Sequence, residues 1–239
     1  MSGAPALVAA SHGTSSPEGR TAVAALVDAV RRSAPGLLVE DAFVDVQAPD
    51  VASVLDALGT GHESVVVPLL LSAGYHVHVD LARAVRGRTG EPRLAAALGP
   101  DERLVDVLLT RLSEAGLRGD DRVVLGAAGS SDVRAVEDCR VIARRLAARL
   151  GRPVSIGFLS AARPGLGEAV ARTRATHPVS RVVVSSYLLA PGYFHDLATA
   201  ARATVTTAPI LRADAPPPTP LVELVLERYA AEAALMRAA

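Results

Sequence analysis

The chain has 239 residues, of which 50% are hydrophobic, 21% charged and 3% aromatic, and its formal net charge is zero. This length and apolar content suit one large α/β domain or two small ones, and they exclude a disordered chain. Zero net charge argues against non-specific nucleic-acid binding, and no apolar run approaches the roughly 18 residues that span a bilayer. The N-terminus has no basic region followed by a cleavage site, so we expect a soluble, cytoplasmic protein.

Residue usage excludes several kinds of chemistry. Cys139 is the single cysteine, which rules out an internal disulfide and a cysteine-based zinc or iron–sulfur site. All 25 basic residues are arginines, so the chain offers no lysine for a Schiff base or for a Walker-type phosphate loop. A nucleotide-driven reaction of the P-loop type is therefore not expected.

Apolar β-branched runs alternate with helical patterns along the whole chain. Ser16 and Pro17 mark a helix start, as N-cap and first helical residue. The expected strands are 7–10, 38–44, 64–71, 94–98, 123–126, 154–159, 181–189 and 209–212. The expected helices are 17–33, 50–58, one from about Val79, 101–115, 132–150, 165–176, 195–204 and 220–237. This alternation predicts parallel sheets joined by right-handed crossovers.

The second half of the chain repeats the first. Residues 7–16 (LVAASHGTSS) match 123–132 (VVLGAAGSSD), and residues 65–76 (VVVPLLLSAGYH) match 182–194 (VVVSSYLLAPGYF). Four such pairs share offsets of 115 to 118 residues. We predict two duplicated domains, 1–118 and 119–239, each a small parallel β-sheet flanked by helices.

Polar residues gather where the strands of the first half end, which is the edge where open parallel sheets bind ligands. His12 follows the first strand, Asp45 the second, and His76 and His78 the third. Of the last two we favour His76, which is nearer the strand end. Two imidazoles and one carboxylate suit Fe(II), Co(II) or Ni(II), and so small a set indicates transient handling of a metal.

The remaining histidines have simpler interpretations. His62 and His177 precede strands at the opposite edge and are expected to be solvated turn residues, whereas His195, at a helix start, stays undecided. Cys139, within an amphipathic helix, is expected in the core, and Asp80 is either a ligand or a helix-terminal charge.

The two halves differ in ligands and in charge. Ala128 and Phe194 stand in the second half where His12 and His76 stand in the first. The first half has 10 arginines and 14 acidic residues, and the second has 15 and 11. We therefore predict one asymmetric site between the halves, with a cation on the first and an anionic ligand on the second. The alternative is that four arginines simply form a solvated helix face: Arg140, Arg144, Arg145 and Arg149.

Six of the seven aromatic residues lie near the carboxyl ends of expected strands. They are Phe43, Tyr75, Phe158, Tyr187, Tyr193 and Phe194. Such a placement suits the walls of a cleft for a flat, apolar ligand. Core packing is the alternative interpretation for Phe43 and Phe158.

Three motifs together resemble a known family. They are SHGT at residues 11–14, FVDVQ-x-P at 43–49, and PLLLSAGYHVHVD at 68–80. The chain is similar, over nearly its whole length, to the sirohydrochlorin chelatases of the CbiX/SirB type, in their long two-domain form. The resemblance implies an ATP-independent lyase (class II chelatase) that inserts Fe²⁺ or Co²⁺ into sirohydrochlorin for siroheme or cobalamin biosynthesis, within porphyrin biosynthesis.

The resemblance also implies roles for single residues. His12 and His76 correspond to the metal-binding histidines, and Asp45 corresponds to an acidic residue that is often Glu in the family. The metal is a substrate rather than a permanent cofactor, and the residues do not distinguish iron, cobalt and nickel. The tetrapyrrole, a polycarboxylate, is expected to contact arginines and the turns beside the cleft. The expected substrate-binding residues are Ser11, Gly13, Thr14, Ser15, Ser72, Gly74, Tyr75, Ser130, Ser131, Arg163 and Tyr193.

Two other functions remain open on the sequence. A non-catalytic carrier of metal or tetrapyrrole is one, although two histidines and one aspartate do not close a tight coordination shell. A phosphoryl-transfer enzyme with His12 as nucleophile is the other, but Ser11 stands where such an enzyme would want an arginine. We expect a monomer with pseudo-dimeric halves and neither a nucleic-acid partner nor a membrane partner.

Overall fold

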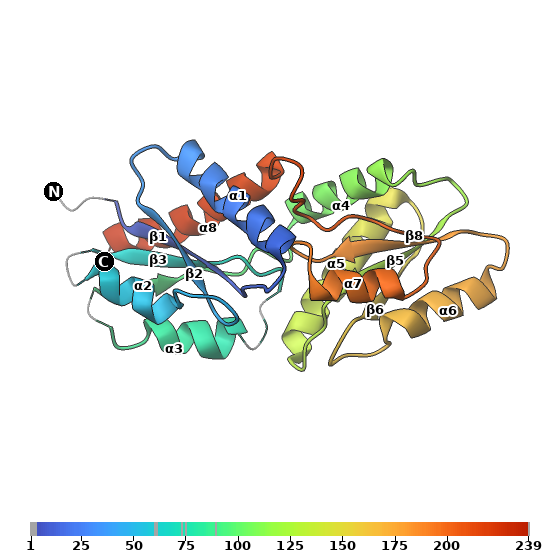
Figure 1. The fold of residues 1–239 in the computed structure, drawn as a ribbon, viewed down its shortest axis with the longest axis horizontal. Coiled ribbons are helices and arrows are strands. Elements are labelled where there is room, and N and C mark those ends of the chain that lie inside the picture. The colour runs from blue at the N-terminus through green and yellow to red at the C-terminus, as the bar shows by residue number, and fades with distance from the viewer. Residues whose placement is uncertain (1–3, 60–61, 73, 75, 89, 239) are drawn as a thin grey trace.

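Two parallel four-stranded sheets, one from each half of the chain, form the framework (Figure 1). This computed structural model describes residues 4–59, 62–72, 74, 76–88 and 90–238, and at 76–78 only the backbone. The strand order is β2-β1-β3-β4 in the first sheet and β6-β5-β7-β8 in the second, so the predicted fold class is confirmed. The strands are β1 (Ala6–Ser11), β2 (Val39–Phe43), β3 (Ser64–Pro68), β4 (Arg93–Leu94), β5 (Arg122–Ala127), β6 (Val154–Phe158), β7 (Val182–Tyr187) and β8 (Val205–Thr206).

Four of the described helices begin at side-chain caps that the sequence makes recognisable. Ser16 caps α1 with Pro17 as its first residue, and Asp50, Asp101 and Asp132 cap α2, α4 and α5. The helical elements are α1 (Pro17–Ser33), α2 (Val51–Leu58), the π-helix η1 (His76–Leu81), α3 (Ala82–Val85), α4 (Glu102–Glu114), α5 (Val133–Leu150), α6 (Leu166–Thr176), α7 (Tyr193–Ala200) and α8 (Thr219–Arg237). Within the described residues, no helix is long and apolar enough to cross a membrane.

The fourth strand of each sheet, β4 or β8, differs in position or length from the strand predicted there. The strand expected at 209–212 is wrong, because the ladder with β7 forms at Val205–Thr206 instead. Pro209 has no N–H to donate, and the apolar residues after it are buried beside the end of β7, where Ile210 N donates to Leu188 O at 2.9 Å. The strand expected at 94–98 is likewise only β4, two residues long.

Other boundaries shift by a few residues. β3 ends at Pro68 rather than Leu71, and helical backbone begins at His76 rather than near Val79. Helix α7 occupies Tyr193–Ala200, so it begins two residues before the expected start and ends four before the expected end. The described residues directly after β3 and β7 therefore lie outside the strands, which leaves them available to face a ligand.

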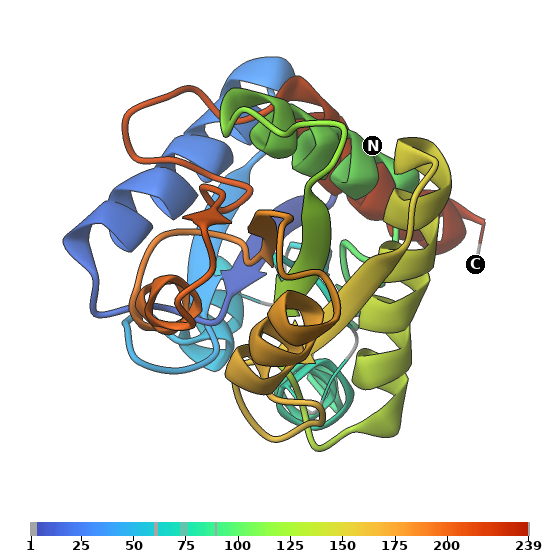
Figure 2. The ribbon, with the colours of Figure 1, turned by 90° about the vertical axis from the view of Figure 1, so that its right-hand side faces the viewer.

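The last helix of each half packs on the sheet of the other half. Helix α4, from the first half, contacts β7 and α5, whereas α8, from the second half, contacts β3 and α1. Figure 1 shows α8 beside α1 on the left and α4 with α5 on the right. Figure 2, with the second half toward the viewer, shows α6 and α7 on the face of the second sheet opposite to α4 and α5. The two repeats thus exchange their final helices.

Two arginines at equivalent positions of the repeat secure this exchange. Arg111 of α4 donates from Nε to Pro209 O at 3.0 Å and from Nη2 to Ile210 O at 2.7 Å. Arg228 of α8 donates from Nε to Ala97 O at 3.1 Å. Each arginine therefore donates to backbone carbonyls of the opposite half of the chain.

The hydrophobic core follows the same arrangement. One large cluster of buried side chains runs through both halves and includes Leu7, Leu108, Leu125 and Leu224. Two smaller clusters belong to single halves, one beneath α2 and the other beneath α6. Because the main core is continuous, the halves are held together by burial of apolar surface.

Candidate active site

A cleft of about 690 Å³ lies where the carboxyl ends of the two sheets approach each other. Tyr187 closes its floor, because its hydroxyl, at the end of β7, donates to Leu71 O at 2.7 Å across the halves. The first half contributes Ser11, His12, Gly13, Thr14, Ser15, Val23, Val46, Gln47, Leu69, Leu70, Leu71, Ser72 and Gly74. The second half contributes Ala127, Ala128, Gly129, Ser130, Ser131, Cys139, Ser160 and every residue from Tyr187 to Phe194.

The turns after β1 and β5 have the same backbone geometry. Gly13 and Gly129 adopt φ values of 89° and 90°, a region that favours glycine. A Cβ atom on Gly13 would lie 2.2 Å from Asp45 O, and one on Gly129 would lie 2.0 Å from Ser160 O. Each glycine therefore allows the loop after the second strand to lie directly against the first turn.

Replacing Gly13 with alanine should destabilise the protein more than the same change at Gly36. Both glycines have φ near 90°, but an added Cβ at Gly36 meets nothing within 4 Å. The difference between the two losses isolates the clash with Asp45 O, and we expect it to exceed about 1 kcal/mol of unfolding free energy. Urea denaturation of both variants measures it, and equal losses would contradict the close approach at Gly13.

Side chains in or beside these two turns accept hydrogen bonds from their backbone N–H groups. Gln47 accepts from Thr14 N at 2.8 Å, and the Thr14 hydroxyl accepts from Ser16 N at 3.1 Å. In the second half, the Ser130 hydroxyl accepts from Asp132 N at 3.0 Å. Sequence reasoning missed Gln47, although the letter Q of FVDVQ was the available signal. The turns are preformed, and the exposed hydroxyl groups of Ser15 and Ser131 line the cleft.

Of the two predicted metal-binding histidines, the structure describes the side chain of His12 but not that of His76. His12 is half-buried and lines the cleft directly after β1. His76 begins η1, but its side chain lies outside what the structure describes, as does all of Tyr75. Among the described residues, no three histidine, cysteine or carboxylate side chains group as they would around a metal ion. A metal set that includes His76 therefore stays a prediction.

The cleft does not include the two charged residues predicted for it. Asp45 is exposed, and its Oδ1 accepts from Val46 N at 2.8 Å within its own turn. Arg163 is exposed and precedes a cis peptide bond to Pro164. Over the described residues, the lining of the cleft holds neither an arginine nor a carboxylate. The roles predicted for Asp45 and Arg163 have no contact in the cleft to support them and stay predictions.

The four arginines of α5 engage acidic partners on helix surfaces. Arg140 and Arg144 contact Glu137, whereas Arg145 and Arg149 contact Glu102 and Asp106 of α4. This arrangement fits the interpretation of a solvated helix face rather than a carboxylate-binding patch.

Two titratable groups on the floor of the cleft stay protonated at neutral pH. Burial raises the pKa of the Cys139 thiol to about 12, so it does not offer the thiolate that binds metals. Burial likewise raises the pKa of Tyr187 well above its ordinary value, which keeps its hydroxyl a donor to Leu71 O. The predicted core placement of Cys139 agrees with its 5% exposure.

Three other histidines contact backbone carbonyl groups outside the cleft, whereas the side chain of His78 lies outside what the structure describes. His62 Nδ1 lies 2.9 Å from Leu58 O, and His177 Nδ1 lies 3.3 Å from Thr173 O. His195 Nε2 lies 3.1 Å from Thr207 O, which ties the first turn of α7 to the segment after β8. His195, left undecided by the sequence, therefore has a structural contact.

The aromatic residues divide between cleft and core. Tyr193 and Phe194 begin α7, line the cleft and contact each other edge to face, with ring centroids 5.6 Å apart. Their side chains are 69% and 37% exposed, which is high for aromatic residues of this size. Phe43 and Phe158, by contrast, do not line the cleft, and Phe158 is buried.

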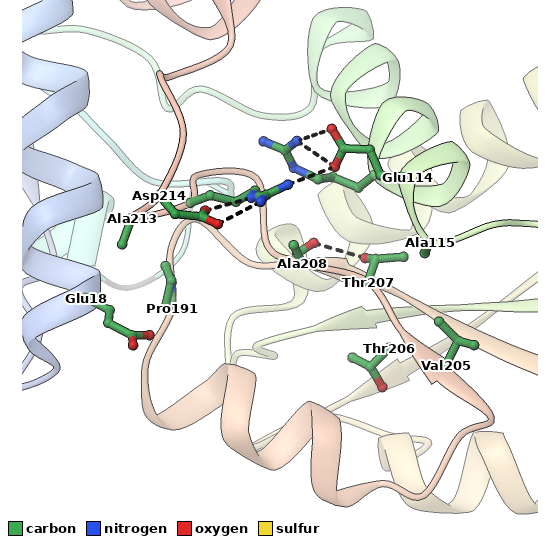
Figure 3. A pocket seen from close by; sticks show the side chains of 12 residues that line it. Glu18, Glu114, Ala115, Pro191, Val205, Thr206, Thr207, Ala208, Ala213 and Asp214 are labelled. Atoms are coloured by element: carbon green, nitrogen blue, oxygen red, sulfur yellow. Dashed lines mark hydrogen bonds and ion pairs between the residues drawn. The ribbon is translucent and has the colours of Figure 1, made fainter.

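A second pocket, of about 610 Å³, holds none of the predicted site residues (Figure 3). Arg111 and Arg212 both contact Glu114 there, and Arg212 also pairs with Asp214. Pro191 lines both this pocket and the cleft. Because its arginines are engaged within the pocket, these groups tie α4 to the segment after β8.

Comparison with known proteins places this architecture in a class and then in a family. Two repeated parallel sheets, with a cleft between their carboxyl edges, define the fold of the class II chelatases. The family model for CbiX matches the chain twice, over residues 6–115 and 122–231. The chain belongs to the CbiX family, and the resemblance found in its motifs is confirmed.

Individual relatives agree with this assignment. Sirohydrochlorin ferrochelatase from Priestia megaterium is 28% identical over 191 residues, covering 76% of this chain and 71% of that protein. The structure of SirB from Bacillus subtilis with Fe³⁺ has a TM-score of 0.81 at 21% identity and covers 98% of both chains. SirB from Bacillus subtilis subspecies spizizenii in complex with cobalt has a TM-score of 0.75 at 21% identity, covering 97% and 96%.

Proposed function

We propose that this protein inserts a divalent metal ion, Fe²⁺ or Co²⁺, into sirohydrochlorin without a nucleotide. The observation that carries the proposal is the cleft between the two sheets, to which the first half contributes His12 and the second half contributes Tyr193 and Phe194. Its volume falls in the usual range for small-molecule sites. Membership of the CbiX family and the named relatives support the same activity.

The residues can carry the steps of this reaction. The metal ion enters as M²⁺ and forms bonds to the pyrrole nitrogens, while two pyrrole N–H protons leave. His12, with His76 as the second proposed ligand, would hold the metal through an imidazole nitrogen. Once the metal has moved to the macrocycle, that nitrogen is free to accept a proton released from a pyrrole N–H. Two ligands from one half bind loosely, which suits a metal that must be transferred.

The walls of the cleft position the macrocycle. Its flat apolar surface lies against the aromatic side chains of α7, where water is excluded. Its carboxylates accept hydrogen bonds from hydroxyl groups of the two turns, such as those of Ser15 and Ser131. Binding energy collected at these groups, remote from the metal, can distort the ring and expose a nitrogen lone pair.

An anaerobic insertion assay tests the proposal. Purified protein is mixed with sirohydrochlorin and Fe²⁺ or Co²⁺, and the absorption spectrum of the tetrapyrrole is followed without added nucleotide. We expect a metal-dependent spectral change that continues over many equivalents of substrate per protein. A change that stops at one equivalent would indicate a carrier, and no change above the protein-free rate would overturn the proposed activity.

The phosphoryl-transfer alternative receives no support from the cleft. Such an enzyme needs cationic groups that hold the phosphate, and the described lining offers no arginine beside His12.

A further inference from the structure

Val46 holds a backbone conformation that is costly for its residue type. Its φ of 62° lies in the left-handed region, where β-branched side chains are strained. Among the described residues, three other non-glycine residues have positive φ: Glu91, Ala161 and Arg202. None of these three is β-branched. Strain of this kind persists only where the surroundings impose it.

The surroundings of Val46 do impose it. Val46 N donates to Asp45 Oδ1 at 2.8 Å, and Gln47 N donates to Asp45 O at 2.6 Å. The same Asp45 carbonyl packs against Gly13. Gln47, the next residue, accepts from Thr14 N. The turn is therefore fixed on both sides of Val46.

The repeat shows that this turn does not require valine. Ala161 stands at the equivalent position in the second half, with φ 53°, and the Ser160 carbonyl before it packs against Gly129 in the same way. Alanine fits this backbone with less steric strain than a β-branched residue. The geometry is thus common to both halves, and the branched side chain belongs to only one.

The two positions differ in what they face. Val46 lines the cleft and is 56% exposed, whereas Ala161 does not line it. The second half contributes Tyr193 and Phe194 to the same cleft, and these are also exposed apolar side chains. An exposed, stiff isopropyl group at the mouth of a ligand cleft gains stabilisation only when a ligand covers it.

We propose that Val46 is a substrate-contacting residue whose side chain packs on the macrocycle, and that it adds an aliphatic contact to those made by Tyr193 and Phe194. This inference rests on the proposed function and adds a residue that determines how the tetrapyrrole is seated. The branched side chain has little freedom at χ1, so it provides a rigid contact at small entropic cost. The backbone strain is then the cost of directing that contact into the cleft.

The test compares Val46→Gly with Ala161→Gly. Both changes relieve a left-handed backbone, so neither should lower the melting temperature by more than a degree or two. We expect Val46→Gly to raise KM for sirohydrochlorin about tenfold, the lower end for burying a valine side chain, and to leave KM for the metal unchanged. Ala161→Gly should change neither. Val46→Ala introduces the residue found at the equivalent position, Ala161, and should raise KM for sirohydrochlorin by a smaller factor.

A binding measurement separates this inference from the proposed function. Metal-free sirohydrochlorin is titrated into each protein and its absorption followed, so that no turnover is required. A Kd about tenfold higher for Val46→Gly than for wild type supports the inference. Wild-type protein that inserts metal, beside Val46→Gly with unchanged Kd and KM, overturns this inference alone. Wild-type protein that neither binds nor metallates the macrocycle overturns the proposed function and this inference with it.

Discussion

Replacement of His12 with alanine should lower kcat/KM for metal insertion by on the order of 10²-fold or more, the effect of losing a general base or a metal ligand. The reason is its position, since His12 lines the cleft at the end of β1. It is half-buried in a loop, so the melting temperature should change little. Steady-state rates under anaerobic conditions, with metal and tetrapyrrole varied separately, measure the effect.

His62→Ala is the matched control for His12→Ala. His62 is exposed and precedes β3 at the opposite edge of the same sheet, and its Nδ1 lies 2.9 Å from Leu58 O. We expect its loss to leave kcat/KM within about twofold of wild type. Similar losses at both positions would mean that the site does not lie at the carboxyl edge.

Replacement of Arg111 with alanine should lower the free energy of unfolding by about 3 kcal/mol. The side chain is only 6% exposed, and its removal leaves the carbonyls of Pro209 and Ile210 without their donor. It also leaves Glu114 without a bidentate partner. Because these bonds join α4 to the other half, the loss should appear as a lower urea midpoint for the whole chain.

Arg144→Ala is the control for Arg111→Ala. Arg144 lies on α5, has a 62% exposed side chain and pairs with Glu137, so its loss should cost less than about 0.5 kcal/mol. Arg228→Ala, with a 22% exposed side chain, should fall between the two. An Arg111 variant no less stable than the Arg144 variant would show that the exchanged helix is not held by these bonds.

The sequence was informative where structure is local or repeats. Ser16 and Pro17 predicted the start of α1, and the matched segments after β1 and β5 correspond to turns with nearly identical glycine geometry. The alternation of strands and helices was sufficient for two parallel sheets, because each half repeats the same order.

The sequence did not predict which segments pack together when they are far apart along the chain. Helices α4 and α8 have the same apolar pattern whichever sheet they cover, so periodicity does not reveal their exchange. The apolar residues around 210 and 211 led to the prediction of a strand. They are buried, but an apolar sequence indicates burial and does not show whether the backbone joins a β-ladder. Val46 and Gln47 line the cleft because of the backbone conformation of one turn. Neither residue type predicts that conformation.

The helix exchange has a consequence for synthesis of the chain on the ribosome. The apolar face of the first sheet is complete only when α8 packs on β3, and α8 begins more than 150 residues after that strand ends. The first half, although it emerges first, therefore has only α1 to cover part of this face until the final helix is released. Vectorial folding, in which an N-terminal domain closes before the next is made, does not apply to this chain.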